Sequence, residues 1–324
     1  KNGLKNMVAQ TPTPKSLGFR MPAEWEKHEA TWLAWPHNAE TFLNLPAVES
    51  AYTEFIHAIA LGEKTRVLVS DAQMKARAEK KLGKAGVNLG NVEFYEIQVV
   101  DGWMRDSAPT FVTNGKEKAM VAWQFNAWGN KYEDLARDNR LWKKINEVTK
   151  LRVFQPGIVL EGGSFDVNGA GALLTTRQCL LNKNRNPHLK QGQIEEFLQN
   201  YLSAGQVIWL GKGIEGDDTD GHVDDITRFV GKNIVVTAVE ENKKDANHAP
   251  LAVNLQTLKQ TQMNGRALEV IELPMPEPLY FEGKRMPASH LNFFVSNASV
   301  IVPVFGSESD EIALRELKKA FPTR

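Results

Sequence analysis

SFDVNGAGALLTT (residues 164–176) is the stretch that decides the fold of this chain. Two strand-like runs flank the pair Asn168-Gly169, which favours a tight hairpin turn. Apolar residues at helical spacing follow in QIEEFLQNYL (193–202), and VIWL (207–210) is a short apolar strand. The order predicted from this stretch is strand, strand, helix, strand.

The same order recurs along the chain. The first strands begin at 164, 227 and 291, a period of 63 and then 64 residues. Downstream we predict strands at 227–230 and 234–239, a helix at 250–262 and a strand at 268–273, then strands at 291–295 and 300–305 and a helix at 310–321. Upstream we predict strands at 110–113, 119–125 and 151–154 around a helix within 133–148, and a further unit in 30–97, with strands at 29–35 and 66–69 and a helix near 48–61. The alternative is an ordinary α/β chain in which the similar spacing is accidental.

About five such units predict an α/β architecture in which the units pack around an axis or along a line, because one unit cannot bury its apolar face alone. A ring of pseudo-symmetric α/β blades fits this count. The last unit lacks a third strand after its helix, so we expect a C-terminal piece beyond Arg324, at least one strand long. The expected domain is 17–324, with 1–16 as an N-terminal extension.

Composition excludes several classes of protein. The 324 residues carry 39 Lys and Arg against 39 Asp and Glu, so the net charge is zero and nucleic acid or a membrane surface is not an expected partner. One cysteine excludes a disulfide scaffold and a Cys-rich zinc module. There is no apolar run long enough to span a membrane, and residues 1–19 do not resemble a secretory signal, so we expect a cytoplasmic protein.

Unusual polar residues share one phase of the repeat. Asp106, Glu161 and the pair His222 and Asp224 each stand just before the first strand of a unit, and Asn292 stands near the start of another. Residues of equal phase converge in a pseudo-symmetric ring. We therefore predict one site that contains all five.

Converging carboxylates attract a cation, and a planar guanidinium fits them best because its fixed fork of donors pairs with carboxylates. His222 can act there as a general acid or base, oriented by Glu161 through its second ring nitrogen. Taken singly, Asp106 and Glu161 are ordinary turn residues, and the acidic stretch 215–225 could be a solvated loop or a metal site. Trp103 and Trp128 are either core residues or the walls of a slot for a guanidinium.

A metal centre is not the favoured interpretation. The EF-hand spacing fails from Asp218, because His222 stands at the third ligand position and no Glu follows at the twelfth. A zinc helix motif is also missing, so we predict no metal and no cofactor. The alternative of a different class is a metal-dependent hydrolase built on His222, Asp220, Asp224 and Glu161.

Eight motifs carry a resemblance that covers nearly the whole chain from Leu17 onward. They are MPAEWE (21–26), HEATWLAWPH (28–37), WMRD (103–106), EGG (161–163), TTRQCLLNKNRNP (175–187), DGHVD (220–224), ELPMPEP (272–278) and NFF (292–294). With them the sequence resembles the agmatine deiminase family, which includes the Porphyromonas-type peptidylarginine deiminases and belongs to the guanidine-modifying superfamily. That resemblance implies a five-bladed α/β propeller, the pentein fold.

The resemblance also implies a reaction, in which a Cys thiolate attacks a guanidinium carbon, ammonia leaves and a covalent amidino-thioester is hydrolysed. It makes His222 the acid and base, and it makes Asp106 and Asp224 the groups that grip the guanidinium. Glu161 becomes an active-site carboxylate partnered with His222, and Trp103 a wall residue. The family's nucleophilic Cys lies in a Gly-rich segment near the C-terminus, which we expect beyond Arg324, and we interpret Cys179 as a small buried residue.

Agmatine is the preferred substrate, because it carries no carboxylate and the stretch 119–130 contains no Arg or Lys to bind one. Asp217, Asp218 and Asp220 offer spare negative charge for a second cation, and Asp220, Trp128 and Asn292 are further substrate-binding candidates. Peptidyl-arginine and binding of guanidines without turnover are the alternatives. Association of several copies is left open.

Overall fold

Three consecutive stretches fold into the same unit in the computed structural model, which describes residues 11–324. In each unit two antiparallel strands are followed by a helix and by a third strand parallel to the second. The units are β4 (Thr110–Thr113), β5 (Lys118–Val121), α5 (Leu141–Thr149), β6 (Arg152–Phe154); β7 (Phe165–Val167), β8 (Ala172–Thr176), α7 (Gln191–Leu202), β9 (Gln206–Leu210); and β10 (Thr227–Gly231), β11 (Ile234–Val239), α8 (His248–Gln260), β14 (Glu269–Pro274). The predicted order is confirmed in these units.

The hairpin between β7 and β8 shows why the sequence folds in this way. Asn168 accepts hydrogen bonds through its side chain from the amides of Ala170 and Ala172, both at 2.9 Å. Gly169 has a φ of 67° and Gly171 a φ of 100°, backbone conformations that glycine adopts at little cost. The turn sets the register, in which Phe165 lies opposite Thr175.

The first sheet differs from the prediction. The elements of this unit follow one another as β1 (Ala30–Ala34), α1 (Leu45–Ala60), β2 (Lys64–Val69), α2 (Ala72–Lys84) and β3 (Val92–Glu96). Its three strands form a parallel sheet. Strand-strand-helix-strand order is therefore wrong for this unit. The cause is α2, which Asp71 caps by accepting from the Met74 amide at 2.7 Å. A helix between two strands gives a crossover connection, and such connections join parallel strands.

The last unit has shorter strands than predicted. β17 (Phe294–Val295) and β18 (Val300–Ile301) pair over two residues each and are followed by α9 (Glu308–Ala320). The Asp310 carboxylate accepts hydrogen bonds from the amides of Phe305, Gly306 and Ser307 in front of α9. Ser307 caps the helix by accepting from the Ser309 amide, and the amides that Asp310 binds are not available to a strand, so the predicted strand 300–305 is shorter.

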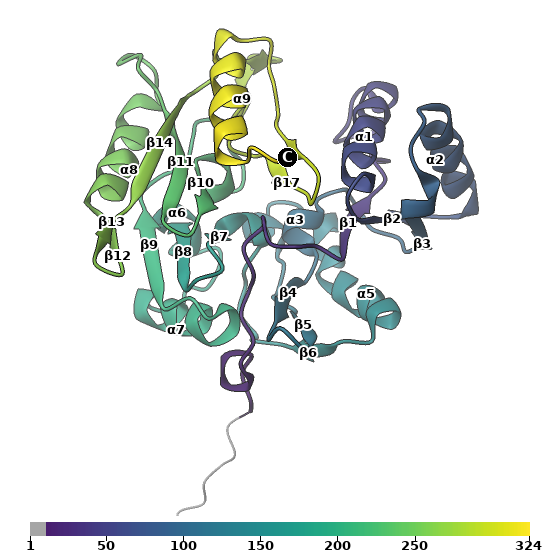
Figure 1. Ribbon diagram of the computed structural model, residues 1–324, viewed down its shortest axis with the longest axis horizontal. Coiled ribbons are helices and arrows are strands. Elements are labelled where there is room, and N and C mark those ends of the chain that lie inside the picture. The colour runs from purple at the N-terminus through teal and green to yellow at the C-terminus, as the bar shows by residue number, and fades with distance from the viewer. Residues whose placement is uncertain (1–10) are drawn as a thin grey trace, which may run out of the picture.

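Figure 1 shows the helices α1, α5, α7, α8 and α9 on the outside of the molecule, around the sheets. α7 packs through Ile194, Leu198 and Leu202, and α8 through Leu251 and Leu258. Two small hairpins follow α8 and β14, namely β12 (Gln262–Met263) with β13 (Arg266–Ala267) and β15 (Tyr280–Phe281) with β16 (Lys284–Arg285). The remaining 3-10 turns are η1 (Lys15–Leu17), η2 (Leu89–Asn91) and η3 (Asp134–Arg140).

Within the described residues, none of the helices has the length and apolar character needed to cross a membrane. Residues 1–10 of the predicted N-terminal extension lie outside the described part of the chain. The first buried apolar side chain after η1 is Phe19, which is 2% exposed and packs on Phe154.

Candidate active site

Three short helical turns stand at the same place in the three complete units, directly before the first strand. They are α3 (Met104–Ser107), η4 (Gly162–Ser164) and η5 (Val223–Asp225). α3 contacts η4, and η4 contacts η5. The shared phase seen in the sequence therefore corresponds to a shared place, where these turns carry or adjoin Asp106, Glu161, His222 and Asp224.

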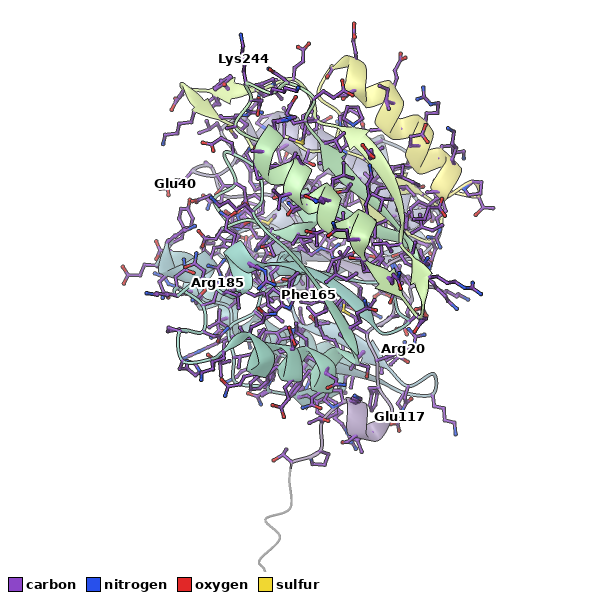
Figure 2. The ribbon with its side chains drawn as sticks, turned by 90° about the vertical axis from the view of Figure 1, so that its left-hand side faces the viewer. Arg20, Glu40, Glu117, Phe165, Arg185 and Lys244 are labelled. Carbon is purple, nitrogen blue, oxygen red and sulfur yellow. The ribbon has the colours of Figure 1, made fainter. Side chains whose placement is uncertain are left out.

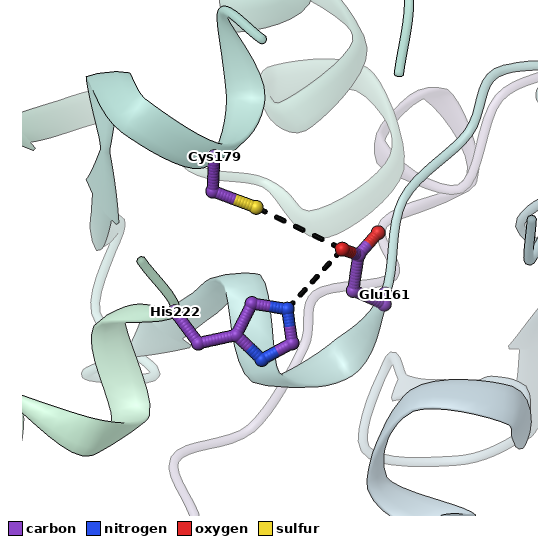
Figure 3. A group of neighbouring side chains, drawn as sticks. All are labelled: Glu161, Cys179 and His222. Carbon is purple, nitrogen blue, oxygen red and sulfur yellow. Dashed lines mark hydrogen bonds and ion pairs between the residues drawn. The ribbon is translucent and has the colours of Figure 1, made fainter. Parts of the chain in front are cut away.

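His222 lies at the centre of this group. Its Nε2 is 3.2 Å from Glu161 Oε1 and forms a hydrogen bond with it (Figure 3). Its Nδ1 is 3.9 Å from Asp106 Oδ1 and 3.8 Å from Asp224 Oδ1. The ring nitrogen that faces the two aspartates is thus the one that Glu161 does not use, and that nitrogen is available for proton transfer.

Gly162 and Gly163 allow these groups to approach. A Cβ on Gly162 would lie 2.0 Å from the Arg105 carbonyl oxygen. A Cβ on Gly163 would lie 2.4 Å from His222 Nδ1 and 2.8 Å from Asp106 Oδ1. The amide of Gly163 also donates to Asp106 Oδ1 at 2.8 Å. Glycine is therefore required here because neighbouring segments approach the backbone closely.

The four groups shift one another's pKa values. Burial by itself would raise the pKa of Glu161, but the hydrogen bond with His222 and the charge of Arg185 lower it to about 2. Burial would lower the pKa of His222, yet the charge of Asp106 and the bond to Glu161 raise that pKa well above its usual value. The arrangement favours a carboxylate at Glu161 and an imidazolium at His222.

Two carboxylate oxygens of the group, Glu161 Oε2 and Asp224 Oδ1, are buried without a hydrogen-bond partner among the described residues. Burial and the negative charge of Asp106 raise the pKa of Asp224 to about 6, against the opposing charges of His222, Arg228 and Arg105. Buried acceptors without donors are costly, and a ligand that brings several donors would satisfy them.

Two arginines lie beside the aspartates, Arg228, which is buried, and Arg105, whose side chain is 42% exposed. Arg105 Nη2 donates to Glu24 Oε2 at 2.5 Å, and Arg228 Nη2 is 3.0 Å from Glu24 Oε1. Arg228 also donates to the Phe293 carbonyl at 2.8 Å and lies over the Phe293 ring at 4.7 Å. These contacts tie the N-terminal segment to three of the repeated units, and they place positive charge near Asp224.

Trp128 contacts the site from a left-handed turn. In α4 (Ala127–Asn130) the φ angles of Ala127, Trp128, Gly129 and Asn130 are all positive, between 52° and 91°. Trp128 Nε1 donates to Asp106 Oδ2 at 3.0 Å. Three non-glycine residues in this conformation store strain, which persists only where the surroundings fix it. The turn delivers an indole donor to a site carboxylate.

Trp103 lies at the rim. It is 41% exposed, its Nε1 donates to Asp101 Oδ2 at 3.1 Å, and its ring meets that of Trp128 edge to face at 5.9 Å. Asn292 is exposed and donates to Asp225 Oδ1 at 2.8 Å rather than to the four clustered groups. Asn292 is therefore next to the site and not in its centre.

The acidic loop is less free than its sequence indicates. Asp217 accepts from Thr219 and from the amides of Gly221 and His222. Asp218 accepts from the Tyr132 hydroxyl, and Lys131 Nζ lies 3.6 Å from it. Asp220 pairs with Lys131 and Arg185, both at 2.8 Å. These contacts hold the loop in place, and the spare negative charge expected for Asp217, Asp218 and Asp220 stays a prediction.

Cys179 belongs to α6 (Arg177–Leu180) and is fully buried. Its Sγ lies 3.7 Å from Glu161 Oε1, on the same oxygen that His222 contacts. Burial and the charge of Glu161 raise the pKa of the Cys179 thiol to about 11. A thiol of this kind is a poor nucleophile at neutral pH, because the thiolate is the reactive form.

Glu161, Cys179 and His222 place one potential ligand atom each within 4.8 Å of one another. Asp220, which the metal-hydrolase alternative needs, points its carboxylate to Arg185 and Lys131 instead. Arg185 also pairs with Glu161. A guanidinium on the ligand carboxylate opposes a second cation there, so the donor set does not favour a metal.

The sequence was compared with known proteins. Residues 20–324 match the Porphyromonas-type peptidyl-arginine deiminase family. The chain belongs to this family. An agmatine deiminase of Pseudomonas aeruginosa is 38% identical over 98% of this chain and 91% of its own length. An agmatine deiminase structure of Enterococcus faecalis has a TM-score of 0.87 at 33% identity, covering 97% of this chain and 91% of that one. A substrate-bound agmatine deiminase structure of C. jejuni has a TM-score of 0.85 at 32% identity, covering 94% and 89%.

Sequence reasoning missed several residues of this family member's site. Arg185, Asn184, Arg105 and Arg228 received no role. A signal was present for Arg185 and Arg105, since they stand in the motifs TTRQCLLNKNRNP (175–187) and WMRD (103–106). For Arg228 there was no signal, because burial of an arginine is not visible in a single sequence.

Proposed function

We propose that this protein is an agmatine deiminase, which hydrolyses a C–N bond of the agmatine guanidinium to give N-carbamoylputrescine and ammonia. The observation that carries the proposal is the group of Asp106, Glu161, His222 and Asp224, in which two carboxylate oxygens have no donor among residues 11–324. A guanidinium supplies a fixed fork of donors to such acceptors. Membership of the family and the agmatine deiminases among the similar proteins support the same reading.

In this proposal Asp106 and Asp224 hold the guanidinium nitrogens, and His222 is the acid and base. A Cys thiolate forms a bond to the guanidinium carbon, and the C–N bond breaks as His222 gives a proton to the departing ammonia. His222 then takes a proton from water, whose oxygen attacks the amidino-thioester. The C–S bond breaks, the ureido product leaves, and the thiolate is restored.

Cys179 is not the nucleophile in this proposal. Its sulfur contacts Glu161 on the Nε2 side of His222, whereas Nδ1 faces the aspartates. A nucleophilic Cys and a closing strand beyond Arg324 stay predictions from the sequence. We further propose that residues 17–324 belong to one catalytic domain whose repeated units form a five-bladed α/β propeller.

The test compares how fast the full-length protein turns over agmatine and a blocked arginine peptide. Ammonia release is the quantity measured. We expect faster turnover of agmatine, and faster turnover of the peptide would reverse the choice of substrate. Tight agmatine binding without product would indicate a binding protein instead. Undiminished activity in the presence of a chelator is expected. A cytoplasmic location and association of several copies stay predictions from the sequence.

A further inference from the structure

The guanidinium of Arg185 is enclosed by acceptors. Its Nε and Nη2 both donate to Glu161 Oε1, the former at 2.8 Å. Nη2 also donates to the Thr219 carbonyl at 2.8 Å, and Nη1 donates to Asn184 Oδ1 at 2.7 Å and to Asp220 Oδ2 at 2.8 Å. An arginine has five N–H groups, and five hydrogen bonds are present. We refer to Glu161, Thr219, Asn184 and Asp220 as the Arg185 cage.

Arg185 is buried although it carries a charge. Figure 2 labels Arg185. The exposed fraction of the Arg185 side chain is 0%. A buried charge is retained only where partners compensate its desolvation, and the cage supplies two carboxylates for one guanidinium. Glu161 contacts both Arg185 and His222. Arg185 therefore acts on the orientation and the pKa of His222 through this one carboxylate.

We propose that Arg185 is a positioning residue for the deimination reaction, which fixes Glu161 so that His222 keeps its Nε2 on Glu161 and its Nδ1 toward the substrate. This inference rests on the proposed function. Glu161 Oε1 lies within hydrogen-bond distance of Arg185, His222 and Cys179, while Oε2 has no partner among the described residues. Two N–H groups of one rigid guanidinium on a single oxygen fix the orientation of the carboxylate. The free oxygen is then held ready for a ligand.

The Arg185 cage also links the turn that carries Trp128 to the loop that carries Asp220. Asn184 Nδ2 donates to Asp220 Oδ2 at 2.9 Å, and the Asn184 carbonyl accepts from Asn126 at 2.9 Å. A Cβ on Gly129 would lie 2.2 Å from Asn184 Nδ2, so the left-handed turn packs directly on Asn184. That turn carries Trp128, which donates to Asp106. Arg185 and Asn184 therefore hold the segment that supports Asp106 against the segment that supports His222.

The charge of Arg185 has a second consequence, for the acidity of His222. The charged or titratable groups around the His222 ring are Glu161, Asp106, Asp224, Asp225 and Cys179, and Asp217 accepts from its backbone amide. All of these stabilise the imidazolium when they are ionised, whereas Arg185 behind Glu161 opposes it. Removal of the Arg185 charge will raise the pKa of His222, and removal of the Asp220 charge, which neutralises Arg185, will lower it.

The experiment uses the full-length protein and three variants, Arg185→Lys, Arg185→Met and Asp220→Asn, with Arg177→Met as the control. Arg177 is an exposed arginine of α6 that donates to Gln191. The readouts are the pKa of the His222 imidazole by NMR titration and the separate kcat and KM for agmatine between pH 5 and 10. The NMR readout does not need turnover, so an inactive wild type would refute the proposed function and leave the positioning of His222 measurable.

For Arg185→Lys we expect kcat to fall by about tenfold or more with KM little changed, because a lysine keeps the charge and loses the fork. For Arg185→Met we expect a larger fall and a His222 pKa raised by roughly one unit. For Asp220→Asn we expect the His222 pKa to move down. Arg177→Met should leave both readouts unchanged.

The proposal is overturned if Arg185→Lys retains kcat to within about twofold. It is also overturned if Asp220→Asn leaves the His222 pKa where it is or raises it, since a merely structural cage predicts no such direction. Arg185→Met removes the cation that pairs with the buried Glu161 and the partly buried Asp220, and it is the variant at risk of misfolding. The lysine and asparagine variants keep the test decisive in that case.

Discussion

Replacement of Gly163 by alanine tests the geometry of the site directly. The added methyl carbon would lie 2.4 Å from His222 Nδ1 and 2.8 Å from Asp106 Oδ1. Ordinary contacts of this kind begin at 3.4 Å, so the imidazole has to retreat by about 1 Å. Both groups belong to side chains and can move without unfolding the chain. We therefore expect Gly163→Ala to be folded and poorly active.

The size of the loss follows from the displacement. A misplacement of about 1 Å in a catalytic constellation costs about 100-fold in rate. That corresponds to about 2.7 kcal/mol of transition-state stabilisation, at 1.36 kcal/mol for each factor of ten. The loss should fall on kcat, because Nδ1 of His222 transfers protons, and on KM, because Asp106 also holds the guanidinium.

Two neighbouring substitutions make the assay specific. Gly162→Ala would place its Cβ 2.0 Å from a backbone atom, the Arg105 carbonyl oxygen. The backbone has less freedom to move, so this variant should lose about 1–3 kcal/mol or more of unfolding free energy. Gly192→Ala in α7 has nothing within 4 Å and is the control, with unchanged activity.

Ammonia release from agmatine and urea denaturation are measured on the full-length protein and all three variants. Activity of Gly163→Ala to within about threefold of the wild type would refute the reasoning, because the methyl group then meets no obstacle at His222. Equal destabilisation of Gly163→Ala and Gly162→Ala with proportional losses of activity would also refute it.

Three further predictions concern other parts of the site. The pKa of Asp224 is raised to about 6, so its charge is lost as the pH falls through that value, and kcat/KM for a guanidinium substrate should decline below about pH 6 in a pH-rate profile but not for Asp224→Asn. Cys179→Ala should retain activity to within about tenfold, because the Cys179 thiol is buried and has a pKa of about 11. If mass spectrometry shows that this variant no longer forms the covalent intermediate, Cys179 is the nucleophile and the prediction is wrong. Asn130→Gly should raise the unfolding free energy by up to about 1 kcal/mol in urea denaturation, since Asn130 has a φ of 62°, and a destabilised variant would contradict the stored strain.

The sequence was sufficient for elements that depend on local patterns. The pair Asn168-Gly169 marks a hairpin because the turn needs these residues and no partner elsewhere. The apolar spacing of α7 and α8 marks their buried faces, and α8 lies two residues earlier than predicted at both ends. The phase of Asp106, Glu161 and His222 was readable because each stands a few residues before the first strand of a unit.

Elements that depend on competition between structures were not predictable. Residues 300–305 are mostly apolar, a pattern that predicts a strand. In the structure the Asp310 carboxylate accepts hydrogen bonds from the amides of Phe305, Gly306 and Ser307, so these amides do not pair with a strand. The first sheet contains a second helix whose low apolar content concealed it, because only Met74, Ala78 and Leu82 are buried. Local pattern cannot decide between two partners for one amide.

The charge balance of the site explains why its cations were overlooked. Four converging acidic or titratable groups imply an attracted cation, and the sequence was read as if the substrate alone supplied it. The structure places Arg185 behind Glu161, and Arg105 and Arg228 near Asp224, so the protein compensates part of this charge itself. Compensation is incomplete, because Asp224 Oδ1 and Glu161 Oε2 keep no donor among the described residues. If the protein's own cations neutralised all the carboxylates, the site would not attract a guanidinium. If no cation were present, repulsion would raise the pKa values of the carboxylates and they would be protonated. Selectivity for a planar cation therefore depends on which carboxylate oxygens the protein's own arginines leave without a donor. The packing of the chain decides this, and the amino-acid composition does not.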